Sequence, residues 1–156
     1  MTNSDAANGT IVSALVRAYN AEIETLANYI ACSETLDGVR AKQVAAALAA
    51  DVPAELGHAQ LLAKRLKTIG GRIPGSMGLK MEQRSLQPPA DTTDVTSVIK
   101  GVIAAEETAI SIYQEIIRLC DGKDYATQDL AIQILRDEEE HRREFVGFLK
   151  EYEKVG

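Results

Sequence analysis

Four long runs of this sequence place apolar residues at the three- and four-residue spacing of an α-helix. No segment alternates apolar and polar residues as a half-buried strand does. The predicted helices cover about residues 10–36, 40–69, 94–120 and 125–154. Only a few residues join the first helix to the second and the third to the fourth, so each pair is expected to form an antiparallel hairpin.

The segment between the second and third helices, residues 70–92, is far longer than a hairpin turn and is rich in glycine and proline. Extended at about 3.3 Å per residue, it can span the length of a helix. A crossover that makes the second and third helices parallel explains so long a connection. We therefore predict an all-α four-helix bundle with one long crossover. It forms a single domain over residues 1–156, with a flexible arm at residues 1–10.

Pro53 lies inside the second predicted helix. A proline there removes one backbone donor and its ring clashes with the carbonyl group of Ala49. Either this helix is kinked at Pro53, or two helices meet at Asp51. The alanine-rich spacing on both sides of the proline favours a single kinked helix.

The apolar stripe of every helix is interrupted by a glutamate, and two stripes also carry the only histidines of the chain, each three residues after a glutamate. An unpaired carboxylate buried in such a stripe is costly and normally takes up a proton. Two divalent cations would neutralise four carboxylates, with two neutral imidazoles as further ligands. Single glutamates from two helices and Glu-x-x-His from two others form the di-iron site of some bundles. The predicted metal ligands are Glu22, Glu55, His58, Glu106, Glu138 and His141.

The two predicted hairpins repeat the same set of residues. Tyr29 follows Glu22 by two helical turns, and Tyr113 follows Glu106 by the same distance. We expect both tyrosines to be core residues whose hydroxyl groups bond to a ligand carboxylate. A role as radical sinks during iron oxidation is the alternative.

Charge and composition exclude several classes of protein. The net charge of −6 argues against a general affinity for nucleic acid or anionic lipid. No stretch approaches the roughly 20 apolar residues of a spanning helix, and the first residues do not form a secretory signal. A cytoplasmic protein without a membrane partner is expected. Cys32 and Cys120 lie on opposite sides of the predicted metal level, so we expect them not to pair.

The segments NAEIETLANYI, ELGH, AEETAISIYQEI and ILRDEEEH resemble the four helices of the ferritin-like superfamily with a bacterioferritin-type di-iron site. The stretch GKDYATQDLAIQILRDEEEH is most similar to the bacterioferritin-related Dps-like (DPSL) branch. The resemblance implies two iron ions bridged by Glu55 and Glu138, with Glu22 and Glu106 as terminal carboxylates and both histidines as ligands. Manganese or zinc would also suit such ligands.

Members of this family oxidise Fe(II) with hydrogen peroxide or oxygen, and many store Fe(III) in a hollow shell. The resemblance therefore implies a ferroxidase and iron-storage protein that protects against oxidative stress, assembled as a homo-oligomeric cage. Two other functions stay open. One is a non-storing di-iron enzyme, such as a rubrerythrin-like peroxidase or an oxygenase. The other is a structural bundle that holds manganese or zinc and performs no chemistry.

Three departures from the family pattern refine these expectations. Leu56 stands where bacterioferritins have a haem-ligating methionine, which argues against haem. Thr108 and Ile117 stand where the Dps-like branch commonly has cysteines, so no thiol role is expected. Too few residues follow His141 for a fifth helix, which favours a shell of twelve subunits. The arm has no basic residue and the tail is balanced in charge, which argues against direct DNA binding.

Overall fold

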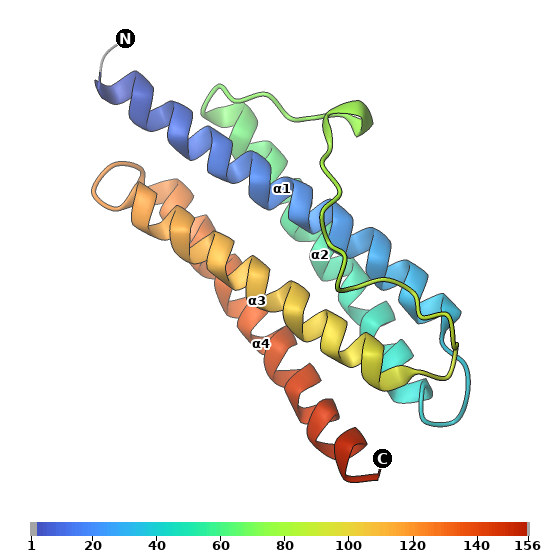
Figure 1. Cartoon of the computed structure of the whole chain (residues 1–156). Coiled ribbons are helices and arrows are strands. Elements are labelled where there is room, and N and C mark those ends of the chain that lie inside the picture. Colours follow the sequence, from blue (N-terminus) through green and yellow to red (C-terminus); the bar gives the residue numbers. More distant parts are fainter. Residues whose placement is uncertain (1–2, 156) are drawn as a thin grey trace.

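A computed structural model describes the backbone of residues 3–155 and the side chains of residues 5–154. Four long helices account for most of this part of the chain, joined by loops with one short 3₁₀ turn, and it contains no strand. The predicted all-α architecture is confirmed (Figure 1). The elements are α1 (Asn3–Thr35), α2 (Lys42–Thr68), η1 (Ser76–Gly78), α3 (Val95–Cys120) and α4 (Tyr125–Val155).

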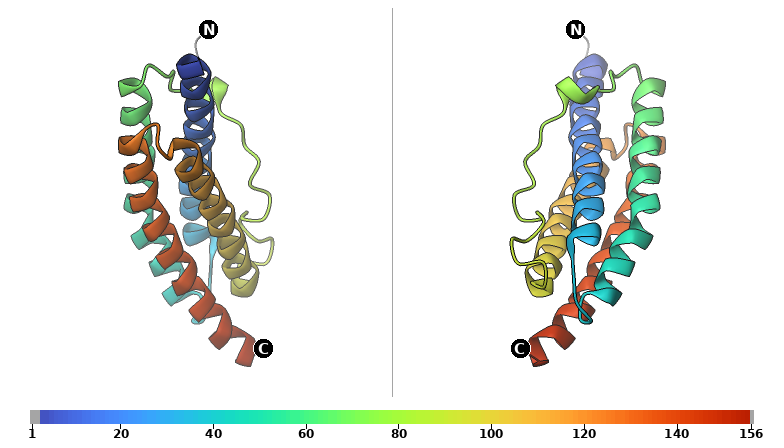
Figure 2. Two further views of the ribbon diagram at one scale, coloured as in Figure 1. Left: turned by 90° about the vertical axis from the view of Figure 1, so that its left-hand side faces the viewer. Right: turned by 90° about the vertical axis from the view of Figure 1, so that its right-hand side faces the viewer.

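The helices are connected as the loop lengths predict. α1 and α2 form one antiparallel hairpin, and α3 and α4 form the other (Figure 1). The crossover between α2 and α3 runs the length of the bundle along the side formed by α1 and α3, which leaves α2 and α3 parallel (Figure 2). No helix in the described part of the chain is long and apolar enough to cross a bilayer.

The beginning of α1 differs from the prediction. This helix begins at Asn3, so the arm expected to be flexible over residues 1–10 is helical from that residue onward; residues 1–2 lie outside the described part. The extension is held against the end of α2, because the Asn8 side chain donates a hydrogen bond to the carbonyl oxygen of Ile69. Ile11, one turn further on, is buried in the core.

The α2 helix continues through Pro53 from Lys42 to Thr68, so the alternative of two helices meeting at Asp51 is wrong. Apolar residues buried on both sides of the proline, Leu48 and Leu62, anchor the two halves of the helix in the core. This packing outweighs the single backbone hydrogen bond that the proline removes.

The core consists of two separate apolar clusters, one toward each end of the bundle. The first, here called the Phe145 cluster, includes Tyr29, Cys32 and Val102. The second, the Ile134 cluster, includes Tyr113 and Cys120. Because the two cysteines belong to different clusters, they cannot meet, and both are free thiols as expected.

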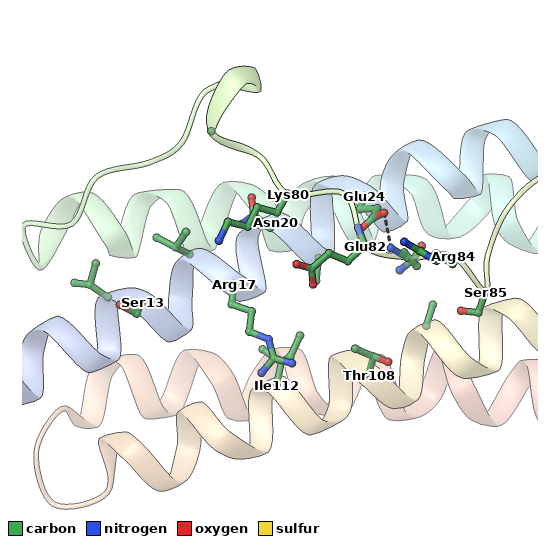
Figure 3. Close-up of a pocket in the computed structure, with 16 residues that line it drawn as sticks. Ser13, Arg17, Asn20, Glu24, Lys80, Glu82, Arg84, Ser85, Thr108 and Ile112 are labelled. Carbon is green, nitrogen blue, oxygen red and sulfur yellow. Dashed lines mark hydrogen bonds between the residues drawn. The ribbon is translucent and has the colours of Figure 1, made fainter.

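The crossover is fixed to α1 by a buried carboxylate that the sequence analysis did not predict. The two carboxylate oxygens of Glu24 accept hydrogen bonds from the backbone N–H groups of Glu82 and Gln83, at 2.9 and 2.7 Å (Figure 3). The Gln83 side chain donates in turn to the hydroxyl group of Thr25 at 2.8 Å. The two backbone N–H groups and both oxygens of Glu24 are thereby paired, and these bonds hold the crossover in a single position over the bundle.

Gly101 lets the crossover pass directly over α3. A Cβ atom at this position would lie 2.5 Å from the carbonyl oxygen of Ser85, far inside contact distance. The next residue of the crossover, Leu86, is fully buried and belongs to the Phe145 cluster. The close approach at Gly101 thus seats an apolar side chain of the crossover in the core.

We expect Gly101→Ala to lower the free energy of unfolding by about 1–3 kcal/mol, because the added methyl group must displace backbone rather than a flexible side chain. Gly147→Ala on α4 is the matched control, since no atom lies within 4 Å of a Cβ placed there. That change should be neutral or stabilising by up to about 1 kcal/mol. Thermal unfolding of the metal-free proteins measures both. Equal melting temperatures for the two variants would contradict this role of Gly101.

Candidate metal centre

All four helices bring their predicted ligands to one level, between the two apolar clusters. All six side chains are buried, and the most exposed of them, His141, is only 8% exposed. The single glutamates come from α1 and α3, and the Glu-x-x-His pairs come from α2 and α4. Together they form what we call the carboxylate layer, composed of Glu22, Glu55, His58, Glu106, Glu138 and His141.

Ligand atoms within this layer fall into two overlapping groups. In each group the atoms lie within 4.8 Å of one another, close enough to surround one metal ion. The first group is Glu22, Glu55, His58 and Glu138; the second replaces Glu22 and His58 by Glu106 and His141. Glu55 and Glu138 belong to both groups, which is the position that a bridging carboxylate requires.

Each imidazole turns its Nδ1 atom toward the carboxylates. His58 Nδ1 lies 2.9 Å from Glu138 and 3.6 Å from Glu22. His141 Nδ1 lies 3.1 Å from Glu55 and 3.9 Å from Glu106. In both cases the nitrogen that faces the layer is the one that would bind a metal ion.

The outer nitrogens of the imidazoles face two aspartates that the sequence analysis missed. His58 Nε2 lies 2.9 Å from Asp137, and His141 Nε2 lies 3.7 Å from Asp51. Asp51 precedes Glu55 by one turn, a same-face spacing that offered a signal. Asp137 offered none, since it is one acid in the run Asp-Glu-Glu-Glu and its side chain is 60% exposed.

The two tyrosines make the expected hydrogen bonds, each across to the opposite hairpin. The Tyr29 hydroxyl group donates to Glu106 Oε1, and the Tyr113 hydroxyl group donates to Glu22 Oε1. Burial and the nearby carboxylates raise the pKa of both phenols well above the ordinary value, so both remain protonated donors. Each bond fixes one oxygen of a single glutamate and leaves the other directed into the layer.

Seven of the nine buried side-chain atoms that lack a hydrogen-bond partner in the described part of the chain lie in this layer; the other two are Asn20 Oδ1 and Asp51 Oδ2. Buried polar atoms are normally paired, so such a set requires an explanation. Both oxygens of Glu55 lack a partner, as do one oxygen each of three other glutamates and the inner nitrogen of each histidine. These atoms are Glu22 Oε2, Glu55 Oε1 and Oε2, His58 Nδ1, Glu106 Oε2, Glu138 Oε1 and His141 Nδ1.

Burial governs the ionisation of the layer. It raises the pKa of Glu55 and Glu138 well above the ordinary glutamate value, and the negative charge of Glu22 raises both further. It also raises the pKa of Glu106. Burial acts on Glu22 in the same sense, but the neighbouring Glu55 carboxyl group and His58 imidazole outweigh it and lower the pKa of Glu22. The layer therefore resists full ionisation unless cations are present.

These properties fit divalent metal ions. Carboxylate oxygens and imidazole nitrogens together suit iron, manganese or zinc. Two cations would match the four carboxylate charges and would occupy the atoms that lack partners. The open groove between α1, α3 and the crossover is a separate feature, because none of the six residues of the carboxylate layer lines it (Figure 3).

Comparison with known proteins identifies a family and a relative to which this chain is similar. Residues 12–155 match the ferritin-like domain family. A "DNA protection during starvation protein" of Pyrococcus furiosus is 26% identical over 142 residues, which cover 89% of this chain and 76% of the relative.

Two solved structures share the fold. A dodecameric thioferritin, the bacterioferritin-related protein from Bacteroides fragilis, superposes with a TM-score of 0.82 at 27% identity, covering 95% of this chain and 89% of the other. A ferritin-like diiron-carboxylate protein from Bacillus anthracis superposes with a TM-score of 0.80, covering 96% and 99%. At 19% identity, the second match supports the fold alone.

Glu138→Gln should stabilise the metal-free protein. Because the pKa of Glu138 is raised in the folded state, the folded chain holds this proton more tightly than the unfolded chain does. Its contribution to stability is therefore present at low pH and is lost as the pH rises toward the raised pKa. A glutamine cannot ionise, so the melting temperature of the variant should exceed that of the wild type by a margin that widens between about pH 5 and 8.

Thermal unfolding followed by circular dichroism in the presence of a chelator tests this expectation. Glu139→Gln is the control, because Glu139 is the exposed neighbour on the same helix. It should leave both the melting temperature and its pH dependence close to those of the wild type. A melting temperature for Glu138→Gln that falls below that of the wild type across this range would contradict the expected charge repulsion.

Proposed function

This chain belongs to the ferritin-like domain family, and we propose that it is a ferroxidase that oxidises Fe(II) with hydrogen peroxide or oxygen. The proposed reaction takes place at the carboxylate layer within each subunit, and the Fe(III) product is then sequestered. Removing iron and oxidant together would protect the cell against oxidative stress. The observation that carries the proposal is the convergence of unpartnered carboxylate and imidazole atoms, with Glu55 and Glu138 shared by both ligand groups.

Iron ions are the substrate of this reaction. Two Fe(II) ions held side by side give one electron each to hydrogen peroxide, so that two Fe(III) ions and two hydroxide ions form and no one-electron radical is released. With oxygen as oxidant, the same pair supplies two electrons and yields hydrogen peroxide after two protons are taken up. The residues of the layer determine whether two ions can be held that close.

Each kind of residue in the layer contributes a different property. The shared positions of Glu55 and Glu138 suit them to bridge the two ions, and the four carboxylates supply charge that offsets the mutual repulsion of the cations. The tyrosine hydroxyl groups orient the single glutamates from α1 and α3. The apolar clusters on either side limit water, which strengthens every electrostatic interaction in the layer.

We also propose that the chain assembles into a homo-oligomeric cage, with twelve subunits favoured, in the cytoplasm. The bacterioferritin-related thioferritin of similar fold is itself described as dodecameric, which supports this number. We propose no haem, because Leu56 has no group that could ligate iron and its side chain is largely on the surface of α2. Direct DNA binding is not part of the proposal, since the chain carries a net charge of −6.

Glu55→Ala and Glu138→Ala should each abolish rapid iron oxidation. Loss of a carboxylate that only contacts a metal ligand typically lowers metal affinity or activity about 10–100-fold. We therefore expect loss of a shared ligand to lower the oxidation rate more than about 100-fold. The appearance of Fe(III) is followed by its near-ultraviolet absorbance after Fe(II) is mixed with hydrogen peroxide or oxygen. Circular dichroism should show unchanged helix content, and Glu139→Ala should oxidise iron at the wild-type rate. Fast oxidation in both ligand variants would contradict the proposed site.

Iron loading distinguishes storage from a non-storing di-iron enzyme. The metal-free protein is given Fe(II) in large excess over two ions per chain, with limiting oxidant, and is then passed through size exclusion. We expect well above two iron ions per chain to elute with a particle much larger than a dimer. A plateau at two ions on a small particle would contradict storage and support a di-iron enzyme. Absence of oxidised iron would overturn the ferroxidase proposal.

A further inference from the structure

The two halves of the carboxylate layer are unequal, although the sequence makes them nearly symmetric. Each imidazole lies beside one outer aspartate, but only one of these contacts is a hydrogen bond. His58 Nε2 and Asp137 Oδ2 are 2.9 Å apart, which is an ordinary hydrogen-bond length. His141 Nε2 and Asp51 Oδ1 are 3.7 Å apart, beyond hydrogen-bond reach.

The inner contacts of the imidazoles show the same difference. The Nδ1 atom of His58 is closer to its two carboxylates, at 2.9 and 3.6 Å, than that of His141, at 3.1 and 3.9 Å. Exposure follows the same order, because the side chain of His58 is 5% exposed and that of His141 is 11% exposed. His58 therefore lies closer to the layer and is fixed at its outer nitrogen by a hydrogen bond, whereas His141 lies further from its carboxylates and has no such bond.

An imidazole whose outer nitrogen donates to a carboxylate is a better metal ligand for two reasons. The hydrogen bond fixes the tautomer with the proton on Nε2, so that the lone pair of Nδ1 points at the metal position. It also fixes the orientation of the ring, which lowers the entropy lost when the metal ion binds. His58 meets both conditions through Asp137, and His141 lacks a partner of this kind among the described residues.

We propose that Asp137 is a positioning residue that holds His58 and thereby makes the His58 half of the layer the tighter of two metal sites. The tighter site consists of Glu22, Glu55, His58 and Glu138, and the weaker site is the one that includes His141. The inference rests on the proposed binding of two divalent ions. Its consequence is an order of filling: the first ion enters the His58 half, and the second ion enters the His141 half.

Titration of the metal-free protein with Co(II) under anaerobic conditions tests this order, since the visible absorbance of Co(II) reports its coordination without any oxidation step. The wild type should bind two ions in two steps whose dissociation constants differ by at least about tenfold. His141→Ala should retain the tight step, and His58→Ala should lose it. Retention of the tight step in His58→Ala, or its loss in His141→Ala alone, would overturn the assignment.

The aspartates form a matched pair of variants. Asp137→Ala should weaken the tight step by about 10–100-fold, and Asp137→Asn should weaken it less, because an amide oxygen still accepts the hydrogen bond. Asp51→Ala should leave the tight step within about threefold of the wild type. Circular dichroism of the metal-free variants checks that each remains folded.

Different outcomes of these titrations overturn the inference and the function on which it rests. Two equal binding steps in the wild type, or an unchanged tight step in Asp137→Ala, would overturn the role of Asp137 while leaving a two-metal site intact. Absence of Co(II) binding by the wild type would overturn both the inference and the proposed metal site. A tight step that is lost equally in Asp137→Ala and Asp51→Ala would also contradict the proposed difference between the two halves.

Discussion

The energetic cost of burying carboxylates dominates this structure. Four helices each bring a glutamate to the same level of the interior, where an isolated ionised carboxylate is strongly destabilising. The metal-free chain limits this cost with protons on groups of raised pKa, such as Glu55 and Glu138, and with hydrogen bonds from Tyr29 and Tyr113. The apolar clusters on both sides of the layer bury the hydrophobic surface that holds the helices together despite this cost.

The near-symmetry of the two hairpins ends at the surface of the bundle. Inside, each hairpin contributes a glutamate, a tyrosine and a Glu-x-x-His pair, and each tyrosine bonds to the glutamate of the other hairpin. Outside, the crossover covers only the side formed by α1 and α3 (Figure 2). The histidines come from α2 and α4, where no crossover lies, so their outer nitrogens depend on nearby side chains. On that side His58 has Asp137 within hydrogen-bond distance, whereas His141 has Asp51 beyond it.

The length of one connection was sufficient to predict the crossover, and helical periodicity was sufficient to predict the bundle and the buried level of the six candidate ligands. The bundle and this level depend on which face of a helix is apolar, and that information is local in the sequence. The hydrogen bonds of Glu24 to the crossover and the approach of Ser85 to Gly101 depend on where a loop backbone passes. No local pattern encodes that path. The helical start of α1 was missed for a related reason, because its first turns are held by a contact from Asn8 to the end of α2.

Burial alone therefore does not identify a metal ligand, as two neighbouring acids of α1 demonstrate. Glu22 and Glu24 are both buried, at 2% and 8% exposure. Both oxygens of Glu24 accept backbone hydrogen bonds from the crossover, so this carboxylate is fully satisfied and has a structural role. Glu22 has one oxygen bonded to Tyr113 and one without a partner, directed toward His58 and Glu55. The unsatisfied oxygen distinguishes a carboxylate that can bind a cation from one that only anchors the fold.

Contacts of the crossover with α1 and α3 explain how the layer keeps its shape without metal. Glu24 ties the crossover to α1 two residues beyond Glu22, and Gly101 lets Leu86 of the crossover enter the core beside α3. Both helices that carry the single glutamates are thus fixed by contacts that involve no metal ion. The carboxylates are held near one another before a cation arrives, so repulsion among them is already present in the folded chain. In the proposed reaction, bound cations would relieve that repulsion.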